Sequence, residues 1–164
     1  MRLNPLFASL PTTVFERMSG LARQHDAVNL GQGFPDGPEP ADLLEAAARA
    51  LRERSNQYPP SRGLPELRAA AADFYNRFDG LALTPENVVV TSGATEAIAA
   101  ALMAAVTPGD EVVVIEPAYN AYRPLIGRAG GVVRAVSLAP PEWRLTAEAL
   151  EAAVTPRTRV LVFN

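Results

Sequence analysis

From residue 88 onward the sequence alternates short apolar runs with segments of helical periodicity. The apolar runs are 88–90, 112–115, 132–138 and 160–163, and the helices predicted between them are 94–106, 121–129 and 146–154. Strands this continuously apolar are buried on both faces, and helical crossovers join parallel neighbours. The pattern therefore predicts an α/β fold in which helices cover both faces of a mainly parallel sheet, giving three layers.

The part of the chain before residue 88 is predicted to be helical, with helices over 15–24, 41–54 and 65–80 and loops rich in glycine and proline between them. At the other end, the last apolar run leads directly to Asn164, with no turn or helix after it. A strand inside a parallel sheet that stopped there would leave polar backbone and apolar side chains without neighbours. We therefore expect the α/β domain to be incomplete in this sequence.

Composition excludes several classes of function. The net charge of -3 and the pI near 5.2 argue against a nucleic acid or an anionic membrane as partner, because such surfaces require a basic excess. Cysteine is absent and His25 is the only histidine, so no metal site is expected. The longest apolar stretch, 97–106, is too short to span a bilayer, and no signal-peptide pattern opens the chain. We expect a cytoplasmic protein.

The most informative segment is the predicted strand that turns at Gly93 into a helix. This geometry directs the backbone N–H groups of Gly93, Ala94 and Thr95 towards one point, where the helix dipole also favours negative charge. The hydroxyls of Thr95 and Ser92 can add donors, so the turn suits a phosphate. A simpler interpretation is that Ser92 caps the helix and Gly93 makes the turn, and Glu96 in the first helical turn fits that interpretation too.

Four segments occur together in the order and approximate spacing of one protein family. They are Asn29–Asp36, Gln57–Arg68, Thr91–Ala97 and Glu116–Tyr122. Together they resemble the class I/II aminotransferases, the fold type I enzymes that use pyridoxal 5'-phosphate (PLP). Their residues are most similar to those of the kynurenine and methionine aminotransferase-like branch. The final residues, 160–164, are similar to the strand that precedes the Asn-Pro-x-Asn-Pro-Thr-Gly turn of this family.

The resemblance covers nearly the whole chain and implies a domain organisation. Residues 1–38 would form an N-terminal arm and a segment of the small domain. Residues 39–164 would form the N-terminal part of the PLP-binding large domain, whose three-layer, mainly parallel sheet is the one predicted above.

Carried over position by position, the resemblance implies that Gly93, Ala94 and Thr95 hold the cofactor phosphate. Tyr119 matches the aromatic residue that stacks on the pyridine ring, and its place after a buried strand suits that role, because ligands of open α/β sheets bind at the carboxyl ends of the strands. The alternative for Tyr119 is a half-buried tyrosine that closes the strand edge.

Two further residues are implied in the site. Tyr58 matches a tyrosine that reaches across a dimer interface to the phosphate of the partner's cofactor, and Gly33 matches a glycine whose backbone lies beside the substrate carboxylate. Taken alone, Tyr58 would be a loop anchor and Gly33 a turn glycine. Two positions depart from the family: Gly37 stands where many relatives have an aromatic residue, which bears on substrate preference, and Pro59 and Pro60 stiffen the Tyr58 loop.

The chemistry also depends on residues that this sequence lacks. PLP transamination requires an amine that bonds the cofactor, an acid beside the pyridine nitrogen and a guanidinium for the substrate carboxylate. All fifteen basic residues of the chain are arginine, so it has no lysine to supply the amine. The resemblance places the lysine, the aspartate and the substrate arginine beyond Asn164, which is itself not assigned to the site. No catalytic residue is therefore assigned.

We expect the 164-residue polypeptide and the whole protein to differ in activity. We expect the whole protein to be a homodimer that transfers an amino group between an L-amino acid and a 2-oxo acid with PLP as cofactor. The 164 residues alone are expected to hold the phosphate-binding and ring-stacking part of the site and to be inactive.

Three alternatives stay open at this point. A PLP-dependent β-eliminating lyase, or a cyclising relative on the same scaffold, would share these motifs, because the phosphate and ring contacts do not choose the reaction. A transcriptional regulator with an aminotransferase-like domain would carry a DNA-binding module upstream. A nucleotide-binding α/β domain would use Thr91–Thr95 as its phosphate loop and Glu116 as its acidic ribose ligand.

Overall fold

The computed structural model describes residues 4–33, 35 and 37–164, which form two compact units. One unit contains the chain up to Glu16 together with Ser92–Asn164, and the other contains Arg17–Thr91. The division into an arm with a small-domain segment over 1–38 and a large-domain part over 39–164 stays a prediction.

Apart from the strand at 88–90, the helices and strands predicted from the sequence are formed with nearly the predicted extent. The unit with the sheet contains α1 (Pro5–Ala8), α5 (Ala94–Ala105), β1 (Glu111–Glu116), α6 (Tyr122–Arg128), β2 (Val132–Ser137), α7 (Ala147–Ala153) and β3 (Thr158–Val162). Helix α2 (Val14–Gln24) begins in this unit and continues into the other, which contains α3 (Ala41–Glu53), α4 (Pro65–Asp79) and the 3₁₀ turn η1 (Pro85–Asn87). Thr146 is the N-cap of α7, since its Oγ1 accepts a hydrogen bond from the Ala149 amide.

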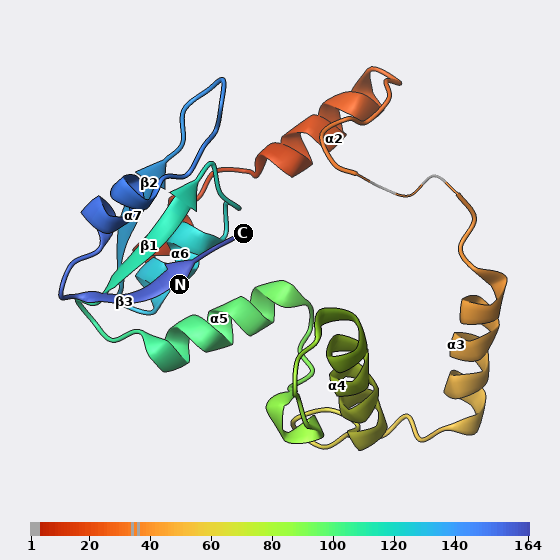
Figure 1. Cartoon of the computed structure of the whole chain (residues 1–164). Helices are drawn as coiled ribbons and strands as arrows, with labels where there is room; N and C mark the ends of the chain where they lie inside the picture. The colour runs from red at the N-terminus through yellow and green to blue at the C-terminus, as the bar shows by residue number, and fades with distance from the viewer. Residues whose placement is uncertain (1–3, 34, 36) are drawn as a thin grey trace. The chain divides into compact units, whose positions relative to one another are not determined.

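The three strands form one parallel sheet in the order β2-β1-β3 (Figure 1). Glu111 pairs with Val132, and the register runs without a break to Glu116 opposite Ser137. On the other side of β1, Val112 pairs with Val160. The prediction of a parallel sheet is therefore confirmed for the strands at 112–115, 132–138 and 160–163.

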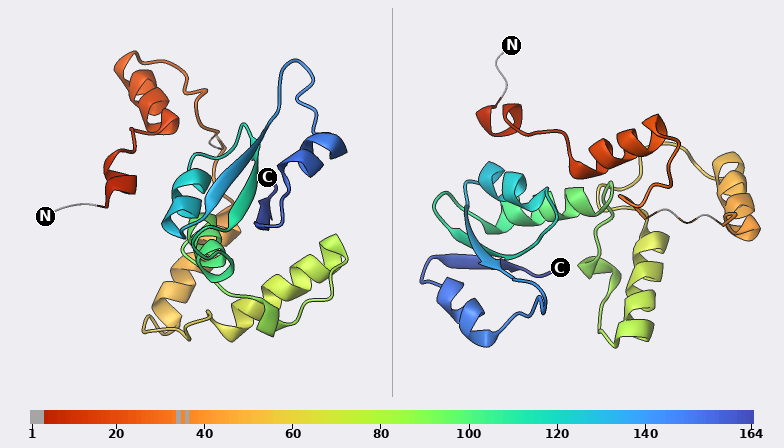
Figure 2. Two further views of the ribbon diagram at one scale, coloured as in Figure 1. Left: turned by 90° about the vertical axis from the view of Figure 1, so that its left-hand side faces the viewer. Right: turned by 90° about the horizontal axis from the view of Figure 1, so that it is seen from above.

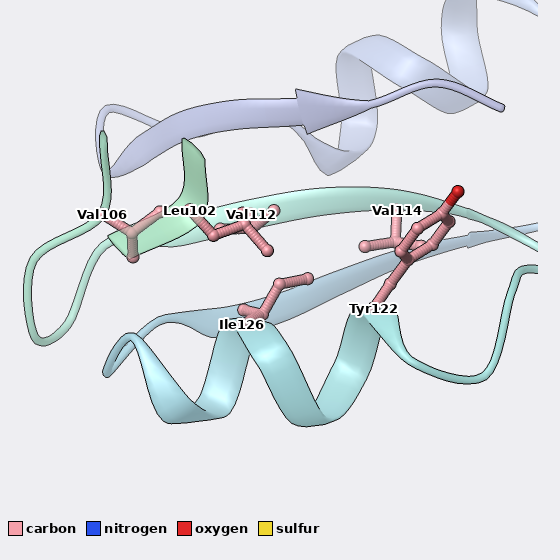
Figure 3. Packing of buried hydrophobic residues seen from close by; sticks show 6 residues of the cluster. All are labelled: Leu102, Val106, Val112, Val114, Tyr122 and Ile126. Atoms are coloured by element: carbon pink, nitrogen blue, oxygen red, sulfur yellow. The ribbon is translucent and has the colours of Figure 1, made fainter. Parts of the chain in front are cut away.

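Alternate residues of β1 face two separate cores, which gives the three layers that the sequence predicts. Val112 and Val114 pack against residues of α5 and α6, whereas Val113 packs against Val136 and Ala153 on the other face, where α7 lies. The right-hand view of Figure 2 shows α6 on one side of the strands and α7 on the opposite side. Figure 3 shows the larger core, in which Leu102, Val106, Val112, Val114, Tyr122 and Ile126 interlock.

The strand predicted at 88–90 is not formed among the described residues, and this part of the prediction is wrong. These residues lie in the unit of Arg17–Thr91, which has no strand among its described residues with which they could pair. Their backbone groups are satisfied in another way: the Val90 amide donates to the Arg62 carbonyl at 3.0 Å, and Arg68 Nε donates to the Val88 carbonyl at 3.0 Å. The apolar run is therefore an extended segment held by the loop and helix before it.

A buried carboxylate lies at the amino edge of the sheet. Glu111, the first residue of β1, is only 2% exposed. Its carboxylate accepts hydrogen bonds from Arg157 Nη2 at 2.6 Å, from Arg157 Nε at 3.1 Å and from Thr155 Oγ1 at 2.8 Å, and Arg134 Nε lies 3.7 Å away. Because Arg134 is on β2 and Arg157 directly precedes β3, this one side chain joins all three strands.

This carboxylate is expected to make stability depend on pH. The hydrogen bonds from Arg157 and then Thr155 hold the pKa of the Glu111 carboxyl below its ordinary value of 4.5. The stabilisation is thus fully present above about pH 4.5 and is lost as the pH falls through the lowered pKa of the folded state. In acid titrations of unfolding free energy, Glu111→Gln should flatten this dependence. Glu45→Gln removes the same charge from an exposed pair with Arg52 and should not; equal profiles for the two variants would contradict the prediction.

Of the helices formed by the described residues, none combines the length and apolar character needed to cross a bilayer.

Candidate functional site

The candidate site lies at the carboxyl edge of the sheet. Helix α5 ends at Ala105 and a short turn leads to β1 at Glu111, while Leu102 and Val106 pack beside Val112 near the start of that strand (Figure 3). Helix and strand therefore run in opposite directions, and the first turn of α5 is directed towards the edge at which β1 ends. Tyr119 follows β1 at this edge, so the fold brings the predicted phosphate-binding and ring-stacking residues to one side of the sheet.

The start of α5 is built on a glycine that has no side chain with which to cap the helix. Gly93 is the N-cap, with φ 82° and ψ 172°, and no side-chain cap hydrogen bond is formed. This combination of angles is open essentially to glycine alone. The simpler interpretation, in which Ser92 caps the helix, does not describe this turn. The Ser92 amide instead donates to the carboxylate of Glu96.

The groups presented by this turn suit an anion. The amides of Ala94 and Thr95 belong to the first helical turn, where no preceding carbonyl of the helix can accept from them. Both residues are exposed, and a Cβ added at Gly93 would meet no atom within 4 Å. Two amides and the Thr95 hydroxyl at the positive end of a helix fit a phosphate such as that of PLP.

Tyr119 presents a partly exposed ring in the loop between β1 and α6. Tyr119 is 41% exposed, and it lines an apolar cavity of about 700 Å³ between residues 6–14 and 119–125. Its ring lies 6.5 Å from that of Phe15 and 5.6 Å from that of Tyr122, centroid to centroid. The ring is therefore supported by two aromatic neighbours while part of it stays open to a ligand, and core side chains do not cover it.

An ion pair closes the loop that carries Tyr119. Arg123 Nε donates to Glu116 Oε1 at 2.6 Å, joining the last residue of β1 to the first turn of α6. This hydrogen bond holds the pKa of the Glu116 carboxyl below its ordinary value of 4.5. The nucleotide-binding alternative requires Glu116 to accept hydrogen bonds from a ribose, but the carboxylate already has an arginine of its own chain as partner.

Sequence reasoning missed Tyr122 as a residue of this region. Its ring is 5% exposed, and its hydroxyl donates to Oδ1 of Asn164, the residue that ends the described chain after β3. The available signal was its position at the start of the predicted short helix, in the same motif as Tyr119.

Gly33 and Tyr58 belong to the other unit, and their parts in a site stay predictions. Gly33 is exposed, with no atom within 4 Å of an added Cβ, and Tyr58 is 99% exposed. A side chain so open is available to a partner molecule. Phe34 and Asp36 of the same motif as Gly33 lie outside the described residues.

Comparison with known families agrees with the fold. Residues 25–164 match the family described as aminotransferase class I and II. This match covers most of the chain. The protein therefore belongs to the class I and II aminotransferase family, as the four sequence motifs predict.

Individual relatives support the same assignment. A probable N-succinyldiaminopimelate aminotransferase of Mycobacterium tuberculosis is 50% identical over 156 residues, which are 93% of this chain and 39% of that protein. The crystal structure of a methionine aminotransferase from Escherichia coli has a TM-score of 0.90 and 40% identity, covering 98% of this chain and 42% of that one. Kynurenine--oxoglutarate transaminase 1 of Mus musculus is 39% identical over 94% of this chain and 39% of its own length. The chain thus spans about two fifths of the length of these relatives.

Proposed function

We propose that the whole protein is a PLP-dependent aminotransferase that moves an amino group between an L-amino acid and a 2-oxo acid. One observation carries this proposal: the glycine-started first turn of α5 and the partly exposed residue Tyr119 lie towards the same edge of a parallel sheet. An anion-binding turn and an aromatic face at one edge of the sheet match a ligand that has a phosphate and a flat ring. Membership of the aminotransferase family supports PLP as that ligand.

Each residue has a physical task in this proposal. The amides of Ala94 and Thr95, with the Thr95 hydroxyl, bind the phosphate and fix the position of the cofactor. Tyr119 covers one face of the ring and limits its tilt. When bound, the cofactor supplies an electron sink for the charge that develops at the substrate α-carbon. Gly33 leaves room for the substrate carboxylate beside its backbone. Tyr58 reaches the phosphate of the cofactor that is bound in a second subunit.

The proposal includes a homodimer located in the cytoplasm. The exposure of Tyr58 is what a residue that contacts a second subunit requires before that subunit binds. The relatives carry the names of different amino acid substrates, so the proposal concerns the class of substrate, an L-amino acid with a 2-oxo acid as acceptor.

Cofactor titration tests the proposal against the nucleotide-binding alternative. The whole protein, freed of cofactor, is titrated separately with PLP and with NAD, and binding is followed by absorbance and by quenching of protein fluorescence. We expect saturable binding of PLP and none of NAD. Tight binding of NAD without binding of PLP would overturn the proposal.

Product analysis separates amino-group transfer from elimination. With PLP bound, a panel of amino acids is offered with and without 2-oxoglutarate as acceptor. A transaminase forms glutamate only when the acceptor is present, whereas a β-eliminating lyase releases ammonia without it. The 164-residue polypeptide is expected to form neither product, because it has no lysine to bond the cofactor.

A further inference from the structure

Tyr119 is supported by a buried neighbour whose position is fixed from three directions. Tyr122 is the first residue of α6, and its ring meets that of Tyr119 edge to face, at an interplanar angle of 78° and a centroid distance of 5.6 Å. This arrangement is a favoured geometry for two aromatic rings. The contact restricts how the ring of Tyr119 can turn, provided that Tyr122 itself does not move.

Two further contacts hold Tyr122 in place. Its ring packs in the core cluster of the sheet, and Figure 3 shows it beside Val114 with its oxygen pointing away from α6. That oxygen donates to Oδ1 of Asn164, which follows β3. The side chain is therefore wedged between α6 and β1 and joined to the end of β3, so the parallel sheet acts as its support.

Exposure differs sharply between the two tyrosines. Tyr119 is 41% exposed and offers part of its ring to a ligand, whereas Tyr122 is 5% exposed and offers none. The loop that bears Tyr119 has no regular structure of its own, and its ends are joined by the ion pair of Glu116 and Arg123. Within the loop, the orientation of the Tyr119 ring depends on what its aromatic neighbours allow.

We propose that Tyr122 is a positioning residue, which orients the ring of Tyr119 for stacking on the cofactor through the edge-to-face contact while remaining out of reach of the cofactor itself. This inference rests on the proposed function, since it assumes that Tyr119 covers PLP. The aromatic ring of Tyr122 makes the contact that orients Tyr119, and its hydroxyl fixes that ring at the end of β3.

The test compares three variants of the whole protein by their PLP dissociation constants and by the visible circular dichroism of bound PLP, which reports the asymmetry of its surroundings. Tyr122→Leu loses the ring contact, so we expect PLP to bind about 3- to 10-fold more weakly, in line with the energy of an aromatic pair, and with an altered dichroism band. Tyr122→Phe keeps the ring and should restore both values to within about twofold of the parent.

Ile126→Val is the matched control, because Ile126 lies in the same helix and the same core but has no aromatic ring that could meet the ring of Tyr119 edge to face. It should lower the unfolding midpoint without changing the dichroism per bound cofactor. Parent-like binding and dichroism in Tyr122→Leu, or equal changes in the control at equal loss of stability, would overturn the inference. Failure of the parent protein to bind PLP would instead contradict the proposed function, and with it this inference.

Discussion

Gly93→Ala in the whole protein is expected to weaken PLP binding roughly 10- to 100-fold, the loss of about one hydrogen bond to a charged group. Gly93 has φ 82° and ψ 172°, a conformation that costs any residue with a Cβ about 1–3 kcal/mol. An alanine can relieve this strain only by rotating the peptide units around it. Such a rotation turns the amide of Ala94 away from the point at which it meets a phosphate.

A second glycine offers the control for this substitution. Gly109 also has a positive φ, 92°, and open space around an added Cβ, but it lies in the turn before β1, at the opposite edge of the sheet. Gly109→Ala should therefore cost similar strain in unfolding measurements and leave PLP binding unchanged. If Gly93→Ala bound PLP as tightly as Gly109→Ala, the phosphate would be held elsewhere and the proposed role of this turn would be wrong.

The sheet could be predicted from sequence because its information is local. Val112, Val113 and Val114 form an uninterrupted apolar run, which indicates burial on both faces, and Thr146 marks the start of a helix by its side chain alone. The run at 88–90 has the same composition, but a strand also needs a partner strand, and composition does not identify one. Its backbone groups form hydrogen bonds with Arg62 and Arg68 instead, and the periodicity of the sequence does not predict these contacts.

The same distinction between local information and contacts of distant residues applies to the candidate site. Gly93 directly precedes a predicted helix, and Tyr119 lies shortly after a predicted strand. The ends of those two elements therefore locate both residues. The support of the site depends on pairs that are far apart in the sequence. Tyr122 meets Asn164 only because β1 and β3 are neighbours in the sheet, and Glu111 meets Arg157 for the same reason. Strand order, which the sequence pattern left open, decides both contacts.

Removal of the Tyr119 ring is the second large effect we expect. Stacking of an aromatic side chain on a flat heteroaromatic ring contributes about 1–3 kcal/mol, so Tyr119→Ala in the whole protein should weaken PLP binding roughly 5- to 100-fold. Stability should change less, because the ring is 41% exposed in the protein without ligand. Binding is measured by titration of the cofactor-free protein, and unfolding by chemical denaturation.

Tyr119→Phe separates the ring from its hydroxyl. The described side-chain contacts of Tyr119 are made by the ring, with Phe15 and Tyr122, so phenylalanine should keep them and bind PLP to within a few-fold of the parent. A large loss in Tyr119→Phe would mean that the hydroxyl, and not the face of the ring, contacts the ligand. Parent-like binding in Tyr119→Ala would show that the ring closes the strand edge and has no contact with the cofactor. Stacking predicts the one remaining pattern, in which alanine fails and phenylalanine suffices.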